Sequence, residues 1–237
     1  MELTSPGFWT TAYRIADRTL VIPFASSRRV ISSAVHGGGI VRANGIINHQ
    51  VLDQNSTSYH EDSEQDPSRF LGELAKQRGV HGRCVGLMTA VDMRCLVLHR
   101  VEADGLWVEG FFTVGVSNAV HAGESTVVYS RQKTQSKVGT INIILLTNAR
   151  LSSAAMVCAV GVATESKTAT LLEESILNAS GTLNATGTGT DVVAVVSGRG
   201  QYCRYSGTHT KMGELIGRIV SQGVKEGLEK DRAWRNS

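Results

Sequence analysis

The sequence predicts an α+β protein, a single compact domain in which helices and strands form mixed layers. Hydrophobic residues make up 41% of the 237 residues, which is enough to fill one large core. Aromatic residues make up only 5%, so Val, Ile, Leu and Ala must fill most of that core. Short runs of β-branched residues recur along the chain, and three longer segments carry apolar residues at helical spacing.

Runs rich in Val, Ile and Leu predict the strands. In chain order they are 19–24, 29–35, 45–52, 83–88, 93–101, 106–114, 141–146, 191–196 and 201–206. Polar, loop-like gaps separate several of them, and none is long enough to require a separable second domain.

The first predicted helix follows Asp66, which stands at the N-cap position with Pro67 at the first helical position and Gly79 just beyond the end. The second runs over 151–175, with Ser152 or Ser153 as its cap. Its first half is apolar all round, which is typical of a helix buried on most sides.

The third predicted helix begins near Thr210 and carries apolar residues at i, i+3, i+4 and i+7 from Met212 to Leu228. Four glycines, Gly213, Gly217, Gly223 and Gly227, lie in pairs four residues apart. Each costs about 1 kcal/mol of helix propensity, so we expect another backbone element to pack closely there.

A weak internal repeat predicts two βαββ-like halves that share one mixed sheet. Each half reads as a strand, a helix, a Thr-x-x-Asp sequence leading into a strand, and a turn rich in Gly and Thr. The Thr-x-x-Asp pairs are Thr89 with Asp92 and Thr188 with Asp191. If the repeat is genuine, a pseudo-twofold axis relates the two turns.

Composition argues against nucleic-acid and membrane partners. The net charge is +3, and the densest basic stretch is the loop 131–137. No signal peptide is visible, and the longest apolar run, 154–163, is about half a membrane span. None of the four cysteines forms a C-x-x-C pair, which favours buried thiols in a reducing compartment. We therefore expect a cytoplasmic protein.

Several motifs are absent from the sequence. It has no G-x-S-x-G elbow, no phosphate-binding G-x-x-x-x-G-K-[ST] and no G-x-G-x-x-G after a strand. No two histidines have the spacing of metal ligands on a helix. We therefore expect neither a metal nor a nucleotide cofactor.

Four polar clusters beside apolar elements are candidates for chemistry. Gly37, Gly38 and Gly39 can present backbone N–H groups to a ligand or an oxyanion, or simply make a tight turn. Glu165 and Lys167 stand at the end of the apolar helical run, where they are either functional or solvated.

Asp191 stands at the entry to a predicted strand, where a carboxylate can also brace a turn. In the last cluster, capping explains Thr210 but not Thr208, His209 or Lys211. A histidine at a helix N-terminus is favoured in its neutral form, which can accept a proton.

In their order along the chain, these clusters resemble the adenosylcobinamide amidohydrolase family of corrinoid salvage enzymes. The resemblance runs from about Arg29 to Gly223. It rests on ISSAVHGGG, GLMTAVD, TVGVSNAVHAGE, GTINIILLTNARLSSAAM, ATESKT, GTGTDVVAVV and YSGTHTKMGELIGR. We expect residues 1–28 to be an N-terminal extension packed on the domain, 29–228 the amidohydrolase domain, and 229–237 a C-terminal tail.

The resemblance implies hydrolysis of the amide between the aminopropanol arm and the corrin ring of adenosylcobinamide or a related corrinoid, which yields adenosylcobyric acid. The corrinoid is then the substrate, and no cofactor is expected. Amide hydrolysis needs a base or nucleophile, an oxyanion stabiliser and an acid for the amine.

The resemblance supplies no catalytic roles, so the following are hypotheses from the residues. His209 or Glu165 is the general base, Asp191 orients it, and Thr208 is a candidate nucleophile. Lys167, Lys211 or the glycine turn holds the oxyanion. The expected substrate-binding residues are Gly37, Gly38, Gly39, Asn48, Thr89, Asn118, Thr188, Thr210 and Lys211.

Two other functions fit the same residues. One is a protein that binds a corrinoid without cutting it, and the other is a threonine-nucleophile amidohydrolase or acyltransferase acting on small amides. The partner in the favoured reading is a small corrinoid, and a homodimer is left open.

Overall fold

The computed structural model describes residues 9–51, 66–125 and 139–235. Its main sheet has eight strands in the order β4-β3-β2-β11-β8-β6-β5, with β1 beside β2. These strands are β1 (Arg14–Ala16), β2 (Thr19–Ser32), β3 (Gly39–Gln50), β4 (Cys84–Thr89), β5 (Val97–Ala103), β6 (Leu106–Val114), β8 (Ile141–Thr147) and β11 (Val192–Val196).

Two short strand pairs and the helices complete the described fold. The pairs are β7 (Ala119–Val120) with β10 (Gly187–Thr188), and β9 (Arg150–Leu151) with β12 (Tyr202–Cys203). The helices are α2 (Pro67–Gln77), α3 (Ser153–Glu173), α4 (Lys211–Arg235) and the 3₁₀ turn η1 (Met93–Cys95). None of the helices in the described part of the chain combines the length and apolar character needed to cross a bilayer.

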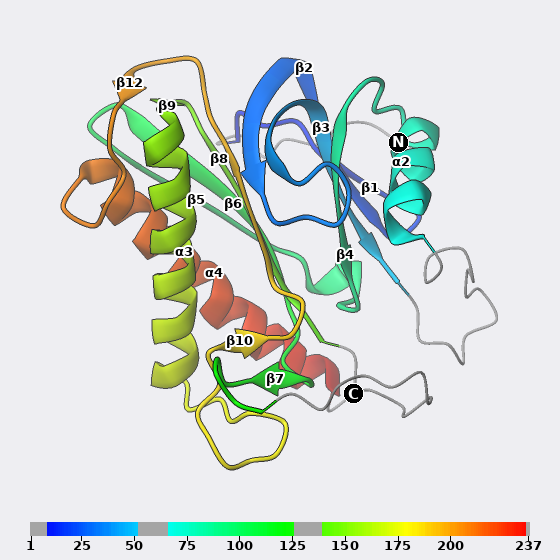
Figure 1. The fold of residues 1–237 in the computed structure, drawn as a ribbon, viewed down its shortest axis with the longest axis vertical. Helices are drawn as coiled ribbons and strands as arrows, with labels where there is room; N and C mark the ends of the chain where they lie inside the picture. Colours follow the sequence, from blue (N-terminus) through cyan, green and yellow to red (C-terminus); the bar gives the residue numbers. More distant parts are fainter. Residues whose placement is uncertain (1–8, 52–65, 126–138, 236–237) are drawn as a thin grey trace.

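The sheet folds over on itself, because β2 and β3 both bend sharply. Their register shifts between Pro23 and Arg28, and the two strands continue in a new direction beyond this point (Figure 1). As a result Asn48 on β3 donates a hydrogen bond to Thr113 on β6, although several strands separate β3 from β6 in the sheet order. We call the bend the fold-over end of the molecule.

The folded sheet and its helices make four layers, α2 on one outer face and α3 with α4 on the other (Figure 1). Side chains such as Ile46, Leu87, Phe111 and Ile144 fill the space between the two sheet layers. Leu71 and Leu74 of α2 cover the outside of one layer. The apolar stripes of α3 and α4 cover the outside of the other. The observed architecture is therefore the predicted α+β domain with one large mixed sheet.

The three predicted helices are confirmed, and their caps act locally. The Asp66 side chain accepts a hydrogen bond from the Arg69 backbone N–H, and Ser152 accepts one from Ala155. Thr210 caps α4 by accepting the backbone N–H of Gly213 at 3.0 Å.

The glycines of α4 have different neighbours. A Cβ at Gly213 would overlap the backbone carbonyl of Gly207, which is the close backbone approach that the sequence predicts. At Gly223 and Gly227 the space is taken instead by the side chains of Phe112 and Val114 on β6. The glycine surface of α4 therefore lets the helix pack closely on the sheet.

The main sheet contains two similar units, one in each half of the chain. Two parallel crossovers are present, β3-α2-β4 and β8-α3-β11, and each is preceded by an antiparallel strand, β2 or β6. The two units lie in the sheet as β4-β3-β2 and β11-β8-β6, in the same order along the sheet. Because the sheet folds over between the two units, β3 and β4 run in space opposite to β8 and β11, and the pseudo-twofold relation of the two turns stays a prediction.

The predicted domain limits fall inside regular elements. β2 spans position 28, so residues 14–16 and 19–28 belong to strands of the main sheet. At the other end α4 continues to Arg235, and residues 229–235 belong to its last turns.

Candidate functional site

The motifs quoted above meet mainly at the end of the sandwich away from the fold-over, which we call the distal end. Here β3, β4 and β6 end, and β8 and β11 begin (Figure 1). Pairing of β7 with β10 brings residues 119–120 beside 187–188. Five segments that are remote in sequence thus come together: 86–92, 113–124, 139–142, 163–168 and 187–193.

A buried ion pair between Lys167 and Asp191 is the centre of this end. The Lys167 Nζ lies 2.5 Å from Asp191 Oδ2, and the two side chains are only 8% and 13% exposed. Lys167 continues the buried stripe of α3 that Ala155, Ala159 and Ala163 form at four-residue spacing. Helix periodicity therefore directs this lysine into the protein rather than into solvent.

Asp191 holds a turn as well as the lysine. Its Oδ1 accepts hydrogen bonds from the Thr188 hydroxyl at 2.5 Å and from the Ile141 backbone N–H at 3.0 Å. Its Oδ2 also accepts the backbone N–H of Thr188 at 3.1 Å. Among the described residues, the Lys167 ammonium makes one hydrogen bond, to Asp191, and so retains donors for a ligand.

Gly187 makes this approach possible. A Cβ at Gly187 would lie 2.5 Å from Asp191 Oδ2 and 2.6 Å from Lys167 Nζ. The ion pair therefore lies directly against a bare backbone, which explains one glycine of the GTGTD sequence. Gly189 of the same sequence has no neighbour within 4 Å of a built Cβ.

A row of buried amide and hydroxyl groups crosses between the two sheet layers near this end. Asn142 on β8 donates to the Asn48 side-chain oxygen at 3.0 Å and to the Met88 carbonyl at 2.7 Å. Asn48 in turn donates to the Thr113 hydroxyl at 3.1 Å. Because both partners of Asn142 are acceptors, its nitrogen is fixed as the donor and its oxygen has no partner among the described residues.

Asn118 presents a second buried side-chain oxygen without a hydrogen-bond partner in the described part of the chain. A Cβ built on Gly139 would lie 2.6 Å from this oxygen. Thr89 is buried at the end of β4, where its hydroxyl accepts the backbone N–H of Val91. Polar groups with spare acceptors therefore cluster beside the ion pair.

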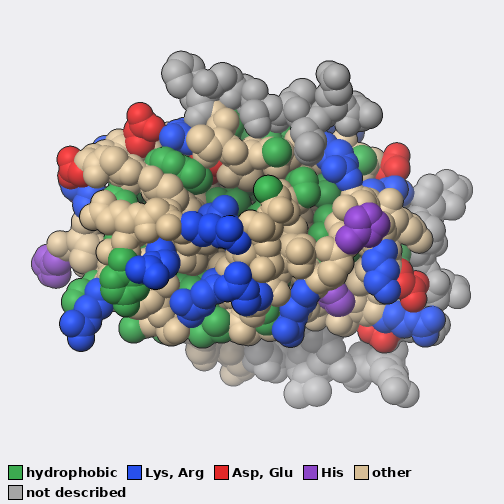
Figure 2. Space-filling model, turned by 90° about the horizontal axis from the view of Figure 1, so that it is seen from above, with side chains coloured by type: hydrophobic (Ala, Val, Ile, Leu, Met, Phe, Trp, Pro, Cys, Tyr) green, Lys and Arg blue, Asp and Glu red, His purple; other side chains and the backbone are tan. Residues whose placement is uncertain are grey.

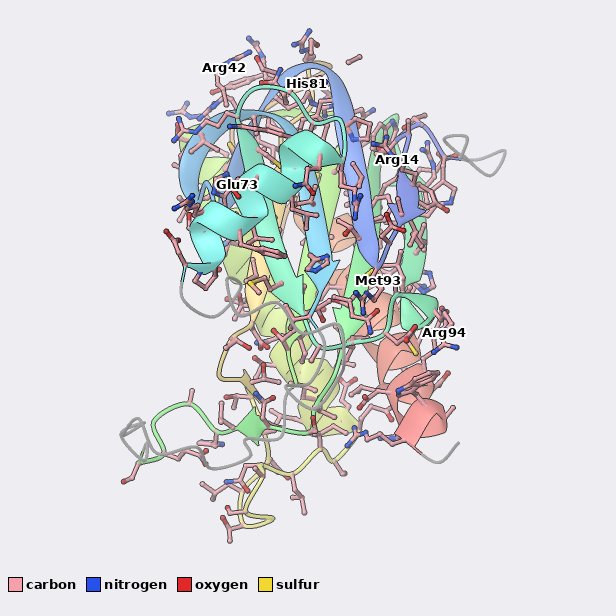
Figure 3. The ribbon with its side chains drawn as sticks, turned by 90° about the vertical axis from the view of Figure 1, so that its right-hand side faces the viewer. Arg14, Arg42, Glu73, His81, Met93 and Arg94 are labelled. Atoms are coloured by element: carbon pink, nitrogen blue, oxygen red, sulfur yellow. The ribbon has the colours of Figure 1, made fainter. Side chains whose placement is uncertain are left out.

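Asp92, on the same side of the molecule, is held by Arg94. A side-chain hydrogen bond from Arg94 is the largest cause that lowers the pKa of the Asp92 carboxyl. Figure 3 shows Arg94 and Met93 beyond the end of β4, at the opposite end from Arg42 and His81. The Thr89/Asp92 sequence therefore caps η1 after β4, whereas Thr188/Asp191 leads into β11.

Of the predicted site residues, the distal end brings together Lys167, Asp191, Thr188, Thr89, Asn48 and Asn118. It does not include His209. The Ser206 hydroxyl bonds the Ala155 carbonyl in the first turn of α3, and Lys167 follows twelve residues later, about 18 Å along the helix. Asp191 is bonded to Lys167, Thr188 and Ile141, so the predicted pairing of Asp191 with His209 is wrong.

The rest of the last cluster stays with His209 at the start of α4. Thr208 and His209 are exposed, and Thr210 is used as the helix cap. Lys211 forms exposed ion pairs with Glu214 at 2.6 Å and with Asp104 at 3.9 Å. The polar side chains of this stretch therefore belong to the exposed start of a helix.

Two further predicted groups have other positions. Glu165 is exposed on α3, because residues two apart do not share a helix face and Lys167 occupies the buried one. Gly37 and Gly38 make the turn between β2 and β3, where a Cβ would overlap backbone of Cys84 or Ala34. Gly39 has φ +88° and no such neighbour. This turn packs on β4, with which His36 pairs at Gly86.

Sequence reasoning missed Gly187, Thr113 and Asn142. The signal for Asn142 was present, since it is one polar residue inside the apolar run INIILL. Gly187 was hidden among several glycines that differ only in their three-dimensional neighbours. In the part of the chain that the structure describes, no group of three or more His, Cys, Asp or Glu side chains is arranged to hold a metal ion.

Comparison with known proteins agrees over nearly the whole chain. The family model described as adenosylcobinamide amidohydrolase matches residues 9–236. An adenosylcobinamide amidohydrolase of Methanosarcina mazei is 34% identical over 227 residues, covering 92% of this chain and 97% of that protein. An uncharacterized protein of Methanocaldococcus jannaschii is 32% identical over 228 residues, covering 90% and 86%.

Solved structures are more distant. The PH0078 protein from Pyrococcus horikoshii OT3 is 11% identical with a TM-score of 0.43, covering 93% of this chain and 78% of that one. A Burkholderia sp. beta-aminopeptidase is 10% identical with a TM-score of 0.45, covering 93% and 79%. Likeness at this level identifies neither a shared fold nor a shared reaction. The family match and the M. mazei relative identify the family. The chain belongs to the adenosylcobinamide amidohydrolase family and is an enzyme that hydrolyses an amide bond.

Proposed function

We propose that this enzyme hydrolyses the amide between the aminopropanol arm and the corrin ring of adenosylcobinamide. The products are adenosylcobyric acid and the free amino alcohol, and the corrinoid is substrate rather than cofactor. Family membership and the name of the M. mazei relative support the substrate.

We place the reaction at Lys167, Asp191 and Thr188. The observation that carries this assignment is the Thr188 hydroxyl, 2.5 Å from a carboxylate that is itself paired with a buried lysine. A buried ion pair costs desolvation free energy and is weak evidence for stability alone. A hydroxyl that faces a carboxylate is a nucleophile with a proton acceptor already in place.

The chemistry then has two stages. The Thr188 oxygen adds to the amide carbon while its proton passes to Asp191 Oδ1, and the Lys167 ammonium stabilises the oxyanion. The C–N bond breaks as the amine leaves with a proton from Asp191, which leaves an ester on Thr188. Water then adds to the ester, and release of the carboxylic acid restores the Thr188 hydroxyl.

The test is incubation of the intact protein with adenosylcobinamide, followed by mass spectrometry of corrinoid and protein. We expect adenosylcobyric acid from the wild type. Thr188→Ala, Asp191→Asn and Lys167→Met should each lower kcat by at least about 10²-fold. Thr188→Ser should retain a hydroxyl and therefore most activity.

Glu165→Gln and His209→Ala are the matched controls, because both side chains are exposed and Glu165 is not on the buried face of α3 that carries Lys167. They should keep near-normal turnover. Full activity in Thr188→Ala would exclude the threonine ester. Tight binding with no product at all would instead identify a corrinoid-binding protein, the rival interpretation.

A further inference from the structure

Basic and acidic residues are segregated along this chain in a way that only the fold makes visible. Three segments contain no Asp or Glu at all: 19–51, 139–164 and 192–210. They contain six arginines, namely Arg28, Arg29, Arg42, Arg150, Arg199 and Arg204. No two of the segments are close in sequence, so the basic group is not apparent as a charge run.

The fold-over end brings these arginines onto one face. Figure 2, which looks onto this end, shows Lys and Arg side chains across the middle of the face and acidic ones mostly at its margins. Figure 3 places Arg42 at the same end. None of the six forms an ion pair with a described carboxylate, whereas arginines elsewhere, such as Arg69 and Arg235, do.

Three of them surround the bend of β2, and we call Arg28, Arg42 and Arg199 the arginine triad. Arg42 and Arg199 both donate to the carbonyl oxygen of Ser27, at 3.2 and 3.1 Å. Arg28, the next residue, is fixed by hydrogen bonds to the carbonyls of Ser197 and Thr147 at 2.8 and 3.0 Å. Three cationic groups are thus held together by backbone oxygens.

The positive charges of the three guanidinium groups repel one another. Burial, and then the charge of Arg199, lower the pKa of the Arg28 guanidinium. Among the causes that act on Arg28, the one that raises its pKa is Glu109, which is fully buried and already paired with Arg100 at 2.6 Å. An anion placed on the triad would relieve this repulsion.

The neighbouring surface extends the positive region and adds aromatic rings. Arg150 lies over the Tyr202 ring and Arg204 over the Tyr205 ring, and these two tyrosines are 53% and 62% exposed. Arg29 donates to Ser153 Oγ in the first turn of α3, so the positive end of this helix dipole faces the same way.

We propose that the arginine triad is a binding site for the phosphate group of a small ligand. Guanidinium groups suit phosphate because they can donate two parallel hydrogen bonds to its oxygens. The phosphate is either free or part of a nucleotide, whose base could reach the exposed tyrosines.

This site is separate from the amide-cleaving one. Arg28 bonds the carbonyl of Thr147 at the end of β8, while Asp191 bonds the N–H of Ile141 at its start. Six residues of extended strand separate the two positions, about 20 Å. A phosphate on the triad therefore does not touch the reacting amide.

Titration calorimetry of the intact protein at low salt, without corrinoid, tests the proposal. Inorganic phosphate and AMP are the probes, and sodium acetate is the control anion. We expect the wild type to bind a phosphate probe. Arg42→Ala with Arg199→Ala should weaken that binding at least about tenfold, since each removes a charge-assisted hydrogen bond.

The matched control is Arg69→Ala with Arg235→Ala, which removes the same two charges from ion-paired positions elsewhere. It should bind phosphate like the wild type. AMP binding tighter than phosphate would indicate a nucleotide, and equal binding a free phosphate.

The proposal is overturned if neither phosphate probe binds the wild type, if acetate binds equally well, or if both double variants lose binding equally. Melting curves show whether the variants are folded, and Arg199→Ala alone serves if the double variant is not. Binding here does not depend on hydrolysis, so the outcome is independent of the proposed reaction.

Discussion

A bare backbone position at Gly187 allows Lys167 and Asp191 to meet. The lysine comes from a helix and the aspartate from the turn before β11, and both reach the same point against residue 187. A charged pair held this way has little freedom to adjust, since Thr188 and Ile141 fix the carboxylate from the other side.

Gly187→Ala should therefore separate the ion pair, because its Cβ would lie 2.5 Å from Asp191 Oδ2. We expect amide hydrolysis to fall at least about 10²-fold, as expected for loss of a preorganised charged group. The measurement is kcat on adenosylcobinamide, with circular dichroism to confirm that the protein is folded.

Gly189→Ala is the control, two residues away in the same sequence and with nothing within 4 Å of the added atom. It should leave turnover within a few-fold of the wild type. Equal effects at both positions would show that the loop as a whole, and not the ion pair, is sensitive to substitution.

For single residues, the sequence identified Lys167, Asp191 and Thr188 as polar residues beside apolar elements. The structure shows that Asp191 contacts the other two. The sequence could not identify their partners. Asp191 with His209 was a plausible pair by chemistry alone, but α3 separates them by most of its length. Which side chains pair depends on their distances in the folded protein. Residue types and their spacing in the sequence do not give these distances.

Helix α4 shows how one residue type serves two purposes in one element. Gly223 admits the ring of Phe112, whereas Gly217 has only Val162 Cγ1 nearby, at 4.0 Å. Both glycines weaken the helix intrinsically by about 1 kcal/mol relative to alanine.

Alanine substitutions should separate these effects. Gly217→Ala should raise the free energy of unfolding by about 0.5–1 kcal/mol through helix propensity. Gly223→Ala should lower it by about 1 kcal/mol or more, because overpacking against Phe112 outweighs the propensity gain. Urea unfolding of the two variants gives both values, and stabilisation by Gly223→Ala would contradict the packing seen here.

Elements with local signals were predictable. Asp66, Ser152 and Thr210 cap their helices where the sequence indicated, because a cap needs only its own next three residues. It was not predictable that β2 is one continuous strand. Pro23 and the polar residues after it look like a break, yet the strand passes through them as a bend.

The inner core of the whole molecule is closed on one side by the segment before β1. Trp9 and Tyr13 pack on Phe111, each with ring centres 5.3 Å from it. Glu109, fully buried on β6, accepts the backbone N–H groups of Thr10 and Thr11 at 2.7 and 3.1 Å and pairs with Arg100. The Glu109 carboxylate therefore holds the segment before β1 against the sheet.

Glu109→Ala should lower the free energy of unfolding by about 3–5 kcal/mol, because it leaves Arg100 without its buried partner and frees two backbone N–H groups. Glu102→Ala removes the exposed partner of the same arginine, 70% exposed, and should cost less than about 1 kcal/mol. Denaturant unfolding compares them, and similar losses would show that Glu109 does not fasten the segment.

The class of the molecule could be predicted from composition and periodicity, but its layering could not. Folding the sheet over requires knowing that β2 pairs with both β3 and β11, a relation between residues far apart in sequence. The arginine triad was missed for the same reason, since Arg28, Arg42 and Arg199 share no local pattern.

The pairing of β2 with β11 also has a consequence for biosynthesis. Val30 pairs with Val196, so at ribosomal speeds β2 waits roughly ten to thirty seconds for its partner to be translated. During that interval one edge of a long strand is open to pairing with other nascent chains. Arg28 and Arg29 come directly before the residues of β2 that pair with β11, and their charge would discourage aggregation until the rest of the protein emerges.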